Sequence, residues 1–123
     1  MTVLNDFSLP APTTTTDIVT TTVLTYPIPN NTGGVFVAKV TGRNTSTNAT
    51  ANAILQFGAQ NVAGTAAVVG TPQATLSVAN GSDASMNTVV VAVSASAGNI
   101  LVRVTGLALT TIQWAAKVEA LVG

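Results

Sequence analysis

Residues 98–119 read GNILVRVTGLALTTIQWAAKVE, and this stretch decides the fold class. Each half alternates apolar and polar side chains, which is the pattern of a half-buried β-strand. The apolar residues that share a face are Ile100, Val102 and Val104 in the first half, and Ile112, Trp114, Ala116 and Val118 in the second. The run AAKVEALV also favours a helix, but the alternation and the β-branched Thr110, Thr111 and Ile112 favour a strand over 110–121.

The chain from Asp17 onwards shows the same organisation, with short runs rich in Val, Ile and Thr between clusters of Gly, Pro and Asn. Turn residues recur every 8–12 residues, a spacing typical of a β-sandwich or barrel. We expect an all-β, antiparallel β-sandwich of jelly-roll-like type, and an immunoglobulin-like strand order fits the count equally well. The eight expected strands are 17–26, 35–43, 51–58, 61–70, 73–79, 86–95, 100–106 and 110–121.

The first 16 residues differ from the rest and predict an extended N-terminal arm before a sandwich domain over 17–123. Pro10 and Pro12 block a helix and push the residues before them towards extended conformations. The arm cannot build a core of its own, and the alternative is a chain end without fixed structure. Its apolar residues, which we expect to bury against a neighbouring molecule, are Val3, Leu4, Phe7 and Leu9.

The segment 89–93, VVVAV, is apolar on both faces. An antiparallel sandwich strand normally turns one face to solvent. We therefore expect this strand either to be covered on both sides or to lie at a subunit interface. The predicted interface residues are Val89, Val91 and Val93, with Val90 and Ala92 on the opposite face as the alternative.

Charge is scarce in this chain, since only 7% of its 123 residues are charged and the net charge is zero. Ordinary soluble domains are about 25% charged, so either uncharged polar residues or partners cover much of the surface. Four scattered cations form no basic patch, so we expect neither nucleic-acid binding nor attachment to an acidic membrane. The charged residues are Asp6, Asp17, Lys39, Arg43, Asp83, Arg103, Lys117 and Glu119.

The chain has few residues of the types that carry out catalysis or bind metals. The chain has no histidine and no cysteine, and the spacing of its four acidic residues suggests no carboxylate pair. It has no P-loop and no calcium-loop motif. We expect a protein that is not an enzyme and that binds no cofactor and no metal. Trp114 is expected to anchor the core and not to serve as a ligand platform.

Four segments together resemble a β-rich module of tailed-bacteriophage virion proteins. The likeness covers roughly residues 35–120 and departs from the pattern around 73–88, where a tryptophan-containing stretch is missing. The segments are AKVTGRN at 38–44, ANAILQFG at 51–58, GNILVRVTG at 98–106 and TTIQWAAKVE at 110–119.

The resemblance implies a virion structural protein. The first expectation is a capsid decoration, or cement, protein that forms a homo-oligomer, specifically a trimer, and binds the major capsid protein or other virion proteins. The alternative is a tail or fibre module that binds a host-surface receptor or glycan through the loops 44–50 and 80–88. The N-terminus has no basic segment followed by an apolar run, so we expect synthesis in the host cytoplasm and residence in the virion.

Overall fold

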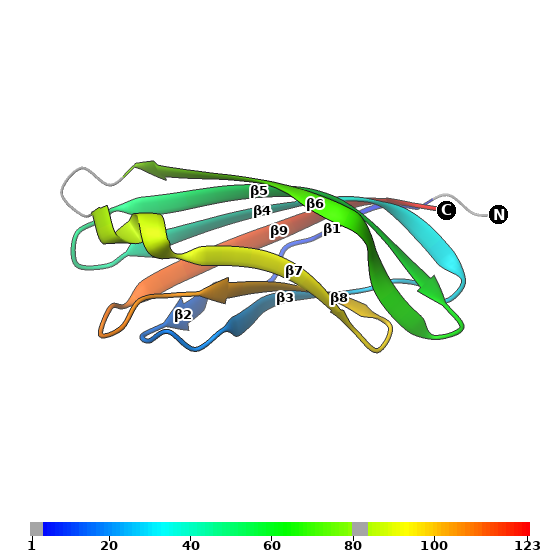
Figure 1. Ribbon diagram of the computed structural model, residues 1–123, viewed down its shortest axis with the longest axis horizontal. Helices are drawn as coiled ribbons and strands as arrows, with labels where there is room; N and C mark the ends of the chain where they lie inside the picture. Colours follow the sequence, from blue (N-terminus) through cyan, green and yellow to red (C-terminus); the bar gives the residue numbers. More distant parts are fainter. Residues whose placement is uncertain (1–3, 80–83) are drawn as a thin grey trace.

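The computed structural model describes residues 4–79 and 84–123 and consists of two antiparallel β-sheets packed face to face (Figure 1). The expected all-β sandwich is confirmed. One short 3-10 helix, η1 (Ala84–Thr88), interrupts the strands. The strands are β1 (Leu4–Ser8), β2 (Thr13–Thr15), β3 (Thr21–Pro27), β4 (Thr32–Asn44), β5 (Thr50–Val62), β6 (Thr65–Ala79), β7 (Val90–Ser96), β8 (Asn99–Thr105) and β9 (Ile112–Val122).

The two sheets differ in size. The larger sheet has six strands in the order β1-β9-β4-β5-β6, with β2 also paired to β9, and the smaller sheet has the order β3-β8-β7. Strands β4, β5 and β6 follow one another as a meander of long antiparallel neighbours. The sandwich was predicted correctly, whereas the jelly-roll arrangement in particular is not confirmed by this strand order.

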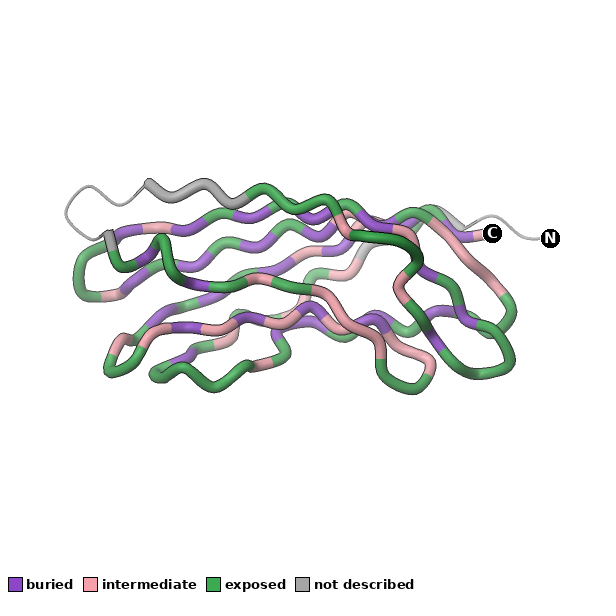
Figure 2. Tube along the Cα trace, in the orientation of Figure 1, coloured by how far each residue is buried: buried purple, intermediate pink, exposed green. Residues whose placement is uncertain are grey.

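The core lies between the sheets and takes every second residue of the long strands. Figure 2 shows buried and exposed positions alternating along β4, β5 and β9. The rings of Phe36 and Phe57 stack with centroids 5.4 Å apart, and Tyr26 of the smaller sheet meets Phe36 edge-on at 5.5 Å. Trp114 is 1% exposed, so the prediction that it anchors the core is confirmed.

One correction concerns the middle of the chain, where strands 61–70 and 73–79 were expected. Strand β5 instead continues to Val62, and β6 is a single strand from Thr65 to Ala79. The turn between them lies at Ala63 and Gly64, both with positive φ (52° and 85°). The N–H of Ala63 donates to the side-chain oxygen of Asn31 at 3.0 Å, and the N–H of Gly64 donates to that of Asn30 at 2.8 Å. These acceptors are distant in sequence, which is why local turn signals misplaced the turn.

A second correction concerns the strand expected over 86–95. Residues 84–88 form η1, and β7 begins only at Val90. The side chain of Met86, which was expected in a strand, belongs to this 3-10 helix. It is fully buried and fills part of the core. Residues 80–83, the first part of the loop 80–88 that a tail or fibre module would use, lie outside the described residues.

The strand expected over 17–26 begins later, at Thr21. Residues 17–19 form a side-chain-stabilised turn instead, because the Asp17 carboxylate accepts a hydrogen bond from the N–H of Val19 at 3.0 Å.

Candidate interaction surfaces

The described part of the predicted arm belongs to the larger sheet of its own chain. Strand β1 pairs with β9 from Leu4–Val122 to Ser8–Val118, and β2 pairs with β9 from Thr13–Trp114 to Thr15–Ile112. Strand β1 therefore uses one of its two backbone edges on β9 of its own chain, and as an end strand it has no described strand on its other edge.

Two side-chain hydrogen bonds fasten the arm. The indole N–H of Trp114 donates to the hydroxyl of Thr15 at 2.8 Å in a buried contact. The Tyr26 hydroxyl donates to a carboxylate oxygen of Asp6 at 3.0 Å, which links the smaller sheet to β1. Burial, together with the hydrogen bond and the negative charge of Asp6, raises the pKa of Tyr26 to about 12.

Two glycines leave room for the hydrogen bond between Trp114 and Thr15. A Cβ atom on Gly42 would lie 2.5 Å from the ring of Trp114, and one on Gly106 would lie 2.7 Å from the Thr15 hydroxyl oxygen. Both glycines belong to segments that carry the virion-module resemblance, at 38–44 and 98–106, and Trp114 belongs to a third. These segments, far apart in sequence, thus meet at the attachment point of the arm.

The predicted interface residues in β7 and just before it point mainly inwards. Val89 is 3% exposed, and Val91 and Val93 are half-buried and pack against the core. On the opposite face, Val90 is 51% exposed and Ala92 is also exposed. The first set therefore stabilises the chain itself, and a subunit interface at this strand stays a prediction.

The predicted interface residues of the arm are only partly described. Leu9 is 66% exposed. Leu4 and Phe7 have described backbone positions in β1, opposite Val122 and Glu119, and their side chains lie outside the description. Val3 lies outside the described residues.

The outer face of the six-stranded sheet is not covered by any described strand or helix (Figure 1). Figure 1 shows the smaller sheet on one side of it and no described strand or helix on the other. The pairing register aligns Leu121, Val35, Gly58 and Val69 across β9, β4, β5 and β6. The three side chains are 54%, 62% and 51% exposed. We call these three residues the apolar row; it spans three strand spacings, or about 14 Å.

Sequence reasoning missed the apolar row because its members come from separate strands that only the register brings together. The one available signal was the alternation in 35–43, where Val35 falls on the side opposite the core residues.

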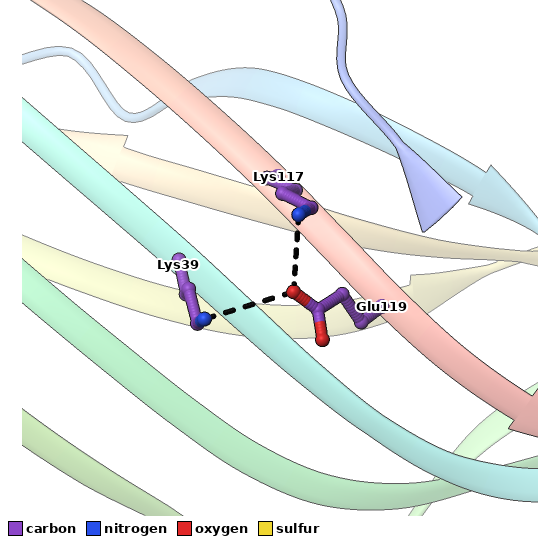
Figure 3. A network of polar contacts seen from close by, with 3 residues as sticks. All are labelled: Lys39, Lys117 and Glu119. Atoms are coloured by element: carbon purple, nitrogen blue, oxygen red, sulfur yellow. Dashed lines mark ion pairs between the residues drawn. The ribbon is translucent and has the colours of Figure 1, made fainter. Parts of the chain in front are cut away.

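Charged residues occupy the same face next to the apolar row. The ammonium groups of Lys117 and Lys39 lie 3.1 and 3.6 Å from one carboxylate oxygen of Glu119 (Figure 3). The hydrogen bond and charge of Lys117, followed by the charge of Lys39, hold the pKa of Glu119 below its usual value. Because all three side chains are about half exposed, solvent screening makes this cluster a feature of the surface and a minor one for stability.

A hollow of about 310 Å³ opens on this face between the arm and the sheet. The side chains of Leu9, Ile54 and Ala115 line it, and Lys39 and Lys117 stand beside them. The arm therefore supplies one wall of a depression whose other walls come from β4, β5 and β9.

Residues 4–79 and 84–123 contain neither a cluster of metal-binding side chains nor a membrane-spanning helix. No group of three or more His, Cys, Asp or Glu side chains in that part of the chain could hold a metal ion. No helix within it combines the length and the apolar character needed to cross a bilayer.

Comparison with known proteins finds a likeness in structure. No protein-family model matches the chain, and no curated protein matches it. Among solved structures, it is similar to the tailspike protein of Acinetobacter baumannii phage AM24, with a TM-score of 0.49 and 12% sequence identity. The likeness covers 96% of this chain and 26% of the tailspike, so the chain spans about a quarter of that protein's length. Similarity at this level assigns no function.

Proposed function

We propose that this chain is a non-enzymatic virion structural protein, specifically a capsid decoration protein that binds and stabilises a phage head. Two things support the proposal: the resemblance of residues 35–120 to virion modules, and the uncovered outer face of the six-stranded sheet. The outer face carries the proposal, because it is a preformed surface that the chain itself leaves unused.

The physical case rests on the apolar row formed by Leu121, Val35 and Val69. Contiguous exposed apolar patches on a protein surface mark interaction sites. Fully burying one such side chain contributes about 1.5–3 kcal/mol. Because the row lies on a hydrogen-bonded sheet, docking requires little ordering of the backbone, and more of this gain remains as affinity.

Self-association is part of the proposal, with a trimer as the expected state. Strand β6 is the end strand of the larger sheet and pairs with β5, and the N–H of Ala66 also donates to the carbonyl of Ala97 in the turn between β7 and β8. The 15 residues of β6, Thr65–Ala79, include no charged side chain. Long edge strands without charges are templates for pairing with another chain. Because a closed trimer needs a head-to-tail contact, the proposed contact joins the β6 edge of one copy to the β1 edge of the next.

The test is binding of the purified protein to heads of the phage that encodes it, measured by co-sedimentation. We expect saturable binding to heads and none to isolated tails. The variant Val35→Gln/Leu121→Gln should bind at least about tenfold more weakly, because it removes two apolar contacts worth over 1.4 kcal/mol together.

The matched control is Val90→Gln, which changes a valine of similar exposure on the smaller sheet. It should bind heads like the unaltered chain. Loss of binding in the control alone would move the interface to β7 and contradict the assignment to the outer face. Binding to host cells or their glycans, with no binding to heads, would replace the proposal with a tail or fibre module.

A further inference from the structure

The basic residues are distributed unevenly over the two sheets. Alternation along β4 and β9 places Lys39, Arg43 and Lys117 on the outer face of the larger sheet, and Arg103 lies on β8 of the smaller. Three of the four cations of a chain with zero net charge therefore share one face.

The described acidic residues do not balance that face. Only Glu119 lies on it, while Asp6 accepts the Tyr26 hydrogen bond on the core side and Asp17 accepts one from its own turn. The outer face accordingly carries three positive charges against one negative charge in the described part of the chain.

Arg43 is held in a fixed orientation by neutral groups. One terminal nitrogen of its guanidinium donates to the side-chain oxygen of Asn48 and the other to that of Gln113, both at 2.9 Å. Amide oxygens orient the guanidinium without neutralising it, and both ion pairs found among the described residues involve Glu119 instead. A guanidinium oriented in this way is prepared to bind a carboxylate.

The hollow beside the arm adds an apolar element to the basic face. Leu9 and Ile54 are 66% and 46% exposed and form part of its wall. Its volume of about 310 Å³ admits an apolar side chain from outside, with Lys39 and Lys117 beside that side chain.

We infer that the outer face docks on an acidic surface of a different protein, with an apolar side chain of that partner in the hollow and carboxylates flanking it. This inference rests on the proposed function and names the chemistry of the partner. The carboxylates would pair with Lys39, Lys117 and Arg43. A second copy of this chain does not fit, because face-to-face contact would bring like charges together.

The direct test is an NMR titration of the isotope-labelled full chain with the peptide acetyl-Asp-Glu-Asp-Leu-Asp-Glu-Asp-amide. We expect amide shifts at residues 39, 43, 54, 115 and 117, with a dissociation constant on the order of 1 mM that rises with salt. The counterpart peptide with lysine at every acidic position should cause no shifts. Shifts confined to the smaller sheet, equal binding of the lysine peptide, or no shifts at several times that concentration would overturn the inference.

Matched variants separate specific docking from general charge. Arg43→Gln and Lys117→Gln should each weaken peptide binding several-fold, whereas Arg103→Gln, which removes the same charge from the smaller sheet, should leave it unchanged. Equal weakening by all three would show that only net charge matters and would overturn the inference.

The inference and the proposed function fail in different ways. If the variant Lys39→Glu/Arg43→Glu/Lys117→Glu still decorates heads at full occupancy, the function stands and the acidic partner surface is wrong. If the acidic peptide binds at the outer face but the protein does not bind heads, the inference stands and the capsid role is wrong.

Discussion

The two faces of the six-stranded sheet are built from the same strands and have opposite characters. On the inner face, Phe36 and Leu55 are at most 2% exposed, while their sequence neighbours Val35 and Ile54 on the outer face are 62% and 46% exposed. The inner face has a partner within the chain, the smaller sheet, and the outer face has none among the described elements. One set of alternating residues therefore forms the core, while the other set stays exposed in the described structure.

The two faces should differ most in how much their residues contribute to the free energy of unfolding. Phe36→Ala should lower the free energy of unfolding by about 3–5 kcal/mol, because it removes a fully buried ring that contacts Tyr26 and Phe57. Val35→Ala, one residue away on the outer face, should change it by less than about 0.5 kcal/mol. Denaturant unfolding measures both.

If both variants lost a similar free energy of unfolding, the outer face would also stabilise the fold. The contrast between the two faces would then be wrong. The informative second readout is head binding, which Val35→Ala should weaken although it leaves stability unchanged.

An intermediate effect is expected at the attachment of the arm. Thr15→Val keeps the shape of the side chain but leaves the buried indole N–H of Trp114 without its acceptor, at a cost of about 1–3 kcal/mol. Thr14→Val, the exposed neighbour in the same strand, is the control and should cost less than about 0.5 kcal/mol. Equal thermal stability of the two variants would contradict the assigned hydrogen bond.

The hydrogen bond between Trp114 and Thr15 also affects how a truncation of the arm can be interpreted. Deleting residues 1–16 would uncover the β9 edge and orphan the Trp114 N–H, so loss of binding after such a deletion would not separate docking from unfolding. Point changes on the outer face are the cleaner experiment.

The smallest effect concerns the link between β1 and the smaller sheet. The pKa of Tyr26 is raised from 10.0 to about 12 in the folded chain, so the folded state holds this proton more tightly than the unfolded state. The associated stability is fully present below pH 10 and is lost as pH rises from 10 towards 12. Tyr26→Phe should cost about 0.5–1.5 kcal/mol at neutral pH and flatten this alkaline decline. An unchanged decline in the variant would show that another group causes it.

Much of the fold could be predicted because alternation is a local signal. The inward residues of 100–104 and 112–118 lie in the core as expected, and Trp114 fills it. The signal failed where distant residues decide the backbone. The turn at Ala63–Gly64 depends on Asn30 and Asn31, and Met86 reaches the core from a 3-10 helix.

The candidate surface was harder to predict for the same reason. The apolar row exists only once register aligns β9, β4, β5 and β6, and the hollow exists only once Leu9 lies against β9. Sequence periodicity predicted Val89, Val91 and Val93 as interface residues and could not show that Val89 is buried in the core of the chain itself or that Val91 and Val93 pack against that core. Low charge predicts a surface covered by uncharged polar residues or by partners, and this signal does not say which sheet would present such a surface.

The central claim is that the chain assembles through the outer face of its larger sheet. The most direct measurement is an electron-microscopy map of phage particles that carry the protein, at a resolution that shows strands. We expect density for this sandwich on the head, with the face bearing Val35, Arg43 and Leu121 against another virion protein. A map in which that face is bare to solvent while the smaller sheet makes the contact would contradict it.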